Sequence, residues 1–199
     1  MKSVEWLKIC GVCGILLPVI AFTFILLAIT SYPQFSWTEN ALSDLGVQEG
    51  ITAILFNSGL VTGGILALVF AFGLFKILGD KALGKVGAFS FILVALALTS
   101  IGVFPESVKP THYYASVMFF TLFPISAFII SATFLLKADL KMGFFTFLVA
   151  SVAMVVWITH WTVGLGSNVA VPEMLSAIPA SAWCIVLGFK MLKAKASKQ

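Results

Sequence analysis

The chain has 199 residues, of which 60% are hydrophobic and 10% are charged. Soluble domains carry about 25% charged residues, so this composition excludes a globule that water solvates over most of its surface. The formal net charge of +4 comes from lysines near the ends of apolar segments, which argues against a nucleic-acid partner. We therefore predict an all-α, polytopic membrane protein in which residues 1–199 form a single domain.

Six apolar segments are long enough to cross a membrane. A transmembrane helix needs about 20 apolar residues to cross about 30 Å of hydrocarbon, and a helix satisfies every backbone group within its own segment. The first segment is too long for the hydrophobic region of a signal peptide, so we expect it to be retained. The predicted spans cover residues 7–31, 51–78, 86–104, 112–136, 142–164 and 170–192.

The connections between these spans divide by charge. Eleven of the twelve lysines fall near the two chain ends or in the connections near residues 76–85 and 137–141, and only Lys109 falls on the other side. Lysine-rich connections face the cytoplasm in most membrane proteins. This distribution predicts a multi-pass protein of the cell membrane with both termini in the cytoplasm.

The longest connection on the outer side, residues 31–50, contains signals for a short helix. Ser36-x-x-Glu39 has the spacing of a capping box, and Gly46 is typical of a helix end. A helix over residues 37–45 would be amphipathic, and we expect it to lie on the extracellular membrane surface. Its apolar side would carry Trp37, Ala41, Leu42 and Leu45, and its polar side Glu39, Asn40, Ser43 and Asp44.

The second predicted span carries small residues at helical spacing. Ser58-Gly59-x-x-Thr62-Gly63 contains two overlapping pairs of small residues four positions apart. Such pairs allow the backbones of two membrane helices to approach closely. This part of the span is therefore predicted to pack against a neighbouring helix.

Polar side chains that can carry chemistry gather on the predicted outer side. The candidates for a catalytic site are Ser43, Asp44, His112, His160 and Glu173. An ionisable group at the depth predicted for His160 is costly to bury and is functional by default. Structural roles remain alternatives, because Glu173 can complement a helix dipole and His160 lies between two tryptophans typical of an interfacial belt.

Two kinds of chemistry fit these residue types. Two imidazoles with one or two carboxylates can hold zinc and leave a position for water. A histidine with an aspartate can also activate Ser43 as a nucleophile. The sequence contains no His-Glu-x-x-His and no Gly-x-Ser-x-Gly motif, so the metal and the cofactor stay open.

The loop motif resembles a known family. Trp37-x-x-Asn40-Ala41-Leu42-Ser43-Asp44-Leu45-Gly46 resembles the Ser-Asp-Leu-Gly signature of a prokaryotic membrane family catalogued as domain of unknown function 998. The similarity continues in Phe56-Asn57-x-Gly59, in Gly102-Val103-Phe104-Pro105-Glu106 and at His112. It covers nearly the whole chain.

The resemblance implies a role connected with lipids. The family looks related to the Frag/DRAM/Sfk membrane proteins, some of which remodel or distribute lipids. A more distant likeness is to intramembrane metal hydrolases such as alkaline ceramidases, which combine Ser, Asp and three His at a zinc site. This chain departs from that pattern, because it has two histidines and six predicted spans where those enzymes have seven.

The preferred hypothesis is therefore a lipid-acting protein, either a hydrolase or a lipid-remodelling protein, with an outward-facing polar site. Asp44 or Glu173 would orient a histidine, and one histidine would act as general base. The alternatives are a non-catalytic lipid-binding or assembly factor and a small transporter. Membrane lipids are the expected partners, with a lipid as a possible substrate, and the sequence leaves open the oligomeric state and whether the protein is an enzyme.

Overall fold

The computed structural model describes residues 2–194, and within them the chain forms six long helices. All six are long and apolar enough to cross a membrane, which confirms the predicted all-α fold with six spans. The predicted bounds of the second and sixth spans are correct, and the third helix begins four residues earlier than predicted. The helices are α1 (Lys2–Thr30), α2 (Ile51–Leu78), α3 (Ala82–Val103), α4 (Thr111–Leu136), α5 (Leu140–Val163) and α6 (Ala170–Leu192).

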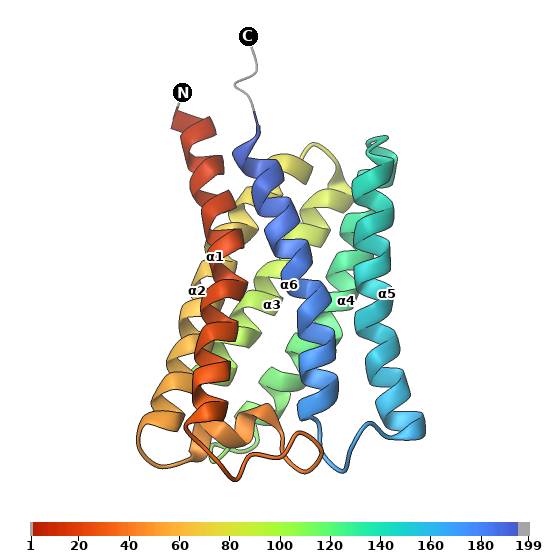
Figure 1. Cartoon of the computed structure of the whole chain (residues 1–199). Coiled ribbons are helices and arrows are strands. Elements are labelled where there is room, and N and C mark those ends of the chain that lie inside the picture. Colours follow the sequence, from red (N-terminus) through yellow and green to blue (C-terminus); the bar gives the residue numbers. More distant parts are fainter. Residues whose placement is uncertain (1, 195–199) are drawn as a thin grey trace.

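The six helices form a closed ring in chain order. Each helix packs against the next, and α6 packs against both α5 and α1 (Figure 1). At the α1–α6 seam, a Cβ atom on Gly11 would lie 2.7 Å from the carbonyl oxygen of Gly188, and a Cβ atom on Gly188 would lie 2.6 Å from that of Gly11. Only glycine at both positions allows the two backbones to approach this closely.

The predicted close packing of the second span is also present. Gly59 of α2 faces the side chain of Phe24 on α1, with no room for a Cβ atom, and Gly63 lies next to Ala21. Both contacts are with α1. Gly59 and Gly63 therefore lie in the α1–α2 interface, whereas Gly64 faces Thr99 of α3.

An aromatic cluster fills the middle of the ring. Trp183 of α6 is fully buried, and the rings of Phe70, Phe91 and Phe123 lie 5.4–6.0 Å from it, centroid to centroid. The indole N–H of Trp183 donates a 3.0 Å hydrogen bond to Thr146 on α5. We call Trp183 and these three phenylalanines the aromatic centre; with Thr146 it joins α2, α3, α4, α5 and α6.

The bundle has two different ends. The start of α1 and the end of α6 lie at one end (top in Figure 1), together with the connections 79–81 and 137–139. We call this the lysine end. The opposite end, which we call the loop end, carries the connections 31–50, 104–110 and 164–169.

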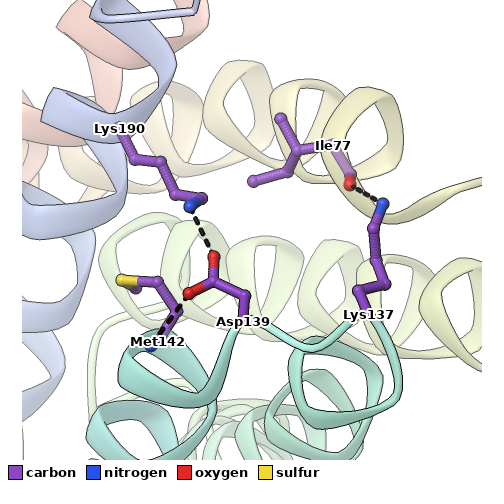
Figure 2. A network of polar contacts seen from close by, with 5 residues as sticks. All are labelled: Ile77, Lys137, Asp139, Met142 and Lys190. Carbon is purple, nitrogen blue, oxygen red and sulfur yellow. Dashed lines mark hydrogen bonds and ion pairs between the residues drawn. The ribbon is translucent and has the colours of Figure 1, made fainter.

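Ion pairs tie the helices together at the lysine end. Lys137 bonds Asp80 at 2.7 Å, and Lys190 of α6 bonds Asp139 at 2.6 Å. Figure 2 shows Asp139 between Lys190 and the backbone N–H of Met142, which it caps at 3.3 Å. Partial burial raises the pKa of Asp139, but the bonds from Lys190 and Met142 outweigh it and hold this pKa below its usual value.

The connection 31–50 contains a short helix, but its predicted extent was wrong. The helix is a 3₁₀ helix, η1, over Leu42–Val47, so Gly46 lies inside it. Ser36 and Glu39 form a turn, in which the Glu39 N–H donates to the Ser36 carbonyl at 3.3 Å. The helix begins later because the Asp44 carboxylate accepts from the backbone N–H of Ala41 at 3.0 Å, which is the capping interaction predicted for Glu39.

The position of η1 also differs from the predicted surface helix. Leu45 is fully buried and Leu42 nearly so, in a cluster with Phe56 of α2 and Ile101 of α3. Trp37, predicted on the apolar side, is 40% exposed. Because burying its leucines is favourable, η1 inserts into the loop end of the ring.

Candidate functional site

A cavity lies inside the ring beneath η1. Its walls come from η1 and from five of the helices, α1, α2, α3, α4 and α6. The volume of the cavity that the centres of water molecules can occupy is about 120 Å³. Since one water needs roughly 10–15 Å³ of such space, the cavity has room for about ten heavy atoms.

The cavity is long and largely apolar. On α6 it extends from Glu173 to Cys184, and on α3 from Ile101 to Phe91. At a rise of 1.5 Å per residue this is roughly 15 Å, or about half of the ~30 Å hydrocarbon thickness. Its deep end reaches the aromatic centre, because Phe91 and Phe123 line it.

A buried carboxyl group stands at the shallow end of the cavity. Glu173 lies in the first turn of α6 and is 7% exposed. One carboxylate oxygen, Oε2, accepts a 2.7 Å hydrogen bond from the backbone N–H of Leu42, so the side chain fastens η1 to α6. Among the described residues, no lysine forms an ion pair with Glu173.

Two further carboxyl groups surround this position. Asp44 accepts from the side-chain amide of Asn40 at 2.8 Å, and Ser43 places its hydroxyl 3.5 Å from Glu106 Oε2. Both Asp44 and Glu106 lie close enough to Glu173 to repel its negative charge. We call Asp44, Glu106 and Glu173 the carboxyl cluster.

The pKa of Glu106 reflects this crowding. Burial raises the pKa of Glu106 above its ordinary value, and a hydrogen bond with Asp44 and the charge of Asp44 raise it further. His112 and Lys109 act in the opposite direction without cancelling the effect. Glu106 therefore holds its proton more tightly than an isolated glutamate would.

His112 lies beside the cluster in the first turn of α4. Its side chain is 5% exposed, and its Nδ1 atom lies 2.8 Å from the carbonyl oxygen of Phe104. A carbonyl only accepts, so Nδ1 carries the hydrogen and Nε2 keeps the lone pair in the neutral ring. The ring thus joins the start of α4 to the residue that follows α3.

His160 lies elsewhere, on α5. Its ring packs edge-on against Trp161 at 4.9 Å and Trp157 at 6.1 Å. Its Nδ1 atom and Trp157 Nε1 are buried, and neither has a hydrogen-bond partner among the described residues. Since α5 does not line the main cavity, His160 lies outside that cavity, beside Trp157 and Trp161.

The structure therefore brings together four of the five predicted site residues, Ser43, Asp44, His112 and Glu173, and leaves His160 apart. Within residues 2–194, no group of three or more His, Cys, Asp or Glu side chains is arranged to hold a metal ion, and neither histidine hydrogen-bonds the Ser43 hydroxyl. The catalytic roles of the five residues stay predictions. What the arrangement offers is an apolar chamber with hydrogen-bond acceptors at one end.

The five predicted site residues include neither Glu106 nor Asn57, which binds η1. Glu106 follows α3 directly and faces the same end as Asp44, and that position beyond a span was the available signal. Asn57 of α2 donates from Nδ2 to the Gly46 carbonyl of η1 at 2.9 Å. A polar amide inside an apolar span was its signal, but its partner is η1 and not another long helix.

Comparison with known families gives one match. A family model described as "Protein of unknown function (DUF998)" matches residues 15–190. The matched range includes the whole of η1, the carboxyl cluster and His112. No curated protein and no solved structure matches the chain. The chain therefore belongs to the DUF998 family of multi-pass membrane proteins of unknown function.

Proposed function

We propose that this protein binds the acyl chain of a membrane lipid inside its helical ring, as a non-catalytic lipid-binding protein. The observation that carries the proposal is the apolar cavity, which is roughly 15 Å long at a rise of 1.5 Å per residue. That length is close to the depth of one leaflet, which is half of the ~30 Å hydrocarbon layer. An acyl segment of about ten carbons has the shape, polarity and length that such a cavity accepts.

The surroundings of the bundle supply the ligand. Large apolar side chains cover the outer faces of the helices, including Phe89 (56% exposed) and Phe144 (64% exposed), so lipid lies against the ring on its outer side. The order of groups along the cavity also matches an amphiphile. Polar side chains stand at the loop end, where head groups lie, and phenylalanines stand toward the middle of the membrane.

Binding is better supported than hydrolysis. Nucleophilic catalysis by a serine needs a base within hydrogen-bond reach. Among the described residues, the hydrogen-bond partner of the Ser43 hydroxyl is Glu106, at the long distance of 3.5 Å. The polar end of the cavity is suited to hold a ligand rather than to activate a nucleophile.

We further propose that the loop end faces the outside of the cell. The lysines of the described residues lie at the other end, apart from Lys109, and lysine-rich ends face the cytoplasm. The bound chain would then come from the outer leaflet of the cell membrane. Labelling of a single cysteine placed at Gln48 from outside intact cells, in a cysteine-free background, tests this orientation; labelling at Lys81 instead would reverse it.

Filling the cavity tests the lipid-binding proposal. Ala177 lines the cavity, whereas its neighbour Ile178 is 52% exposed on the outer face of α6. The variants A177F and I178F therefore place the same side chain on the inside or the outside of the ring. The ligand is a neutral long-chain alcohol with a fluorescent polyene chain, added to purified protein in detergent micelles.

We expect the wild type and I178F to bind this alcohol, and A177F to bind it at least about tenfold more weakly, because the loss of a few buried methylene contacts is worth that factor. Thermal unfolding of both variants shows whether each is folded. Equal binding by folded A177F and I178F would contradict the proposal, as would the absence of binding to the wild type.

A further inference from the structure

We infer that the ligand of this cavity is a single-chain amphiphile with a protonated amine as its head, held by Glu173 and Ser43. This inference rests on the proposed function and adds the chemical class of the ligand. The starting observation is the charge at the polar end of the cavity. That end is formed by side chains that accept hydrogen bonds, and cations complement it.

Glu173 provides the main contact. Its side chain is 93% buried, since 7% is exposed, and it lines the cavity. Its Oε2 atom holds the Leu42 N–H, and no described lysine neutralises its charge. A buried carboxylate without a counter-ion is costly, and an ammonium group arriving at the same place recovers that free energy.

The neighbouring groups favour the same sign of charge. Asp44 and Glu106 add negative charge near Glu173, and Ser43 adds a hydroxyl that lines the cavity and lies 3.5 Å from Glu106. Lys109, the one lysine at this end within the described residues, lies in an exposed position of the 104–110 connection. A phosphate or carboxylate head would meet repulsion here, whereas an amine would meet acceptors.

The dimensions limit the ligand to one chain. The cavity has room for about ten heavy atoms on the water-sized scale, and its walls come from five helices and η1. Phe91 and Phe123 of the aromatic centre line its deep end. A two-chain lipid would have to leave one chain outside the ring, so a single-chain amine is the best fit.

The test compares head groups on one chain. Three probes share the same fluorescent polyene chain and end in a primary amine, a hydroxyl or a carboxylate; each is titrated at neutral pH into the full-length wild type, E173Q and E39Q. Glu39 is an exposed acid of the same end, so E39Q is the matched control. Glutamine at position 173 keeps an acceptor for the Leu42 N–H and removes the carboxylate charge.

We expect the wild type and E39Q to bind the amine at least about tenfold more tightly than the alcohol, because hydrogen bonds to charged groups are worth that factor. The carboxylate should bind most weakly. E173Q should lose the preference for the amine while still binding the alcohol. Ethanolamine, which has the amine and no chain, should not displace the bound probe.

Each failure has its own meaning. Equal binding of the amine and the alcohol by the wild type would overturn this inference and leave the lipid-binding proposal standing. This comparison uses the wild-type protein alone. An unchanged preference in E173Q, or displacement by ethanolamine, would also overturn the inference. Absence of binding for all three probes would overturn the proposed function itself.

Discussion

The acidic side chains at the two ends of the ring have opposite electrostatic surroundings. At the lysine end, Asp80 and Asp139 each bond a lysine, at 2.7 and 2.6 Å. At the loop end, Asp44, Glu106 and Glu173 lie close together, and none of them forms an ion pair with a described lysine. The acids of the lysine end hold helices together, whereas those of the loop end repel one another.

The difference indicates at which end the arrangement of charges does not stabilise the fold. Like charges held together in a partly buried place reduce stability unless protons or a ligand compensate for them. Opposite charges in contact at an exposed helix end need no further explanation. The unbalanced loop end is therefore where a ligand is expected, and the next four experiments test how far the two ends differ.

The largest effect is expected from removing the buried leucine of η1. Leu45 is fully buried, so L45A should lower the free energy of unfolding by about 2–5 kcal/mol. V47A, at the exposed end of η1, should change it by less than about 0.5 kcal/mol. Equilibrium unfolding in mixed micelles measures both, and similar values for the two variants would mean that η1 is not part of the core.

A smaller loss is expected from Glu173→Ala. The substitution leaves the buried N–H of Leu42 without its acceptor, which costs about 1–3 kcal/mol. E173Q should restore most of this stability, because the amide oxygen can accept the same bond. If E173A and E173Q are equally unstable, the charge of Glu173 and not its hydrogen bond holds η1.

Glu106→Gln should stabilise the protein at neutral pH. The raised pKa of Glu106 means that its contribution to stability is full below its ordinary value of 4.5 and is lost as the pH rises through the folded-state pKa. Glutamine resembles the protonated acid, so the melting temperature of E106Q should exceed that of the wild type at neutral pH and match it at acidic pH. A lower melting temperature at neutral pH would show that the Glu106 charge is needed.

The smallest effect, and one of opposite sign, is expected at the lysine end. The lowered pKa of Asp139 means that its contribution is present above its ordinary value of 3.8 and is lost as the pH falls through the folded-state pKa. D139N should therefore be less stable at neutral pH, by less than about 1 kcal/mol because the pair is partly exposed, and equal at acidic pH. Asparagine still caps α5. If the stability of D139N relative to the wild type changed with pH in the same direction as that of E106Q, the two ends would not differ in the way proposed.

Much of the fold could be predicted from sequence, because long apolar segments have one solution in lipid. The bounds of α2 and α6 are clear because polar residues or glycine lie within two positions of each end, as Gly50 does before Ile51. The 31–50 connection was harder. Ser36 and Asp44 are both possible capping residues, and the start of η1 depends on the bond from the Ala41 N–H to Asp44 together with the burial of Leu42 and Leu45.

The candidate site could be predicted only in part. The sequence groups Asp44, His112 and Glu173 at one end of the spans, because Asp44 lies in the 31–50 connection and the other two lie at helix starts of the same end. Whether a side chain faces the cavity depends on how its helix packs against its neighbours. The sequence does not give the order of the helices in the ring, so it could not show that His160 lies apart from the other candidates. The cavity exists because the apolar side chains of neighbouring helices do not fill the space between them. The sequence pattern does not show where such a space remains.

The seam between Gly11 and Gly188 has a consequence for biosynthesis. These two residues belong to the first and the last helix, so the contact that closes the ring joins the parts of the chain that are made furthest apart in time. Until α6 enters the bilayer, the interior of the growing bundle lies open along one side to the surrounding lipid. Enclosure of the chamber therefore requires α6, and a truncation before α6 removes a wall of the chamber.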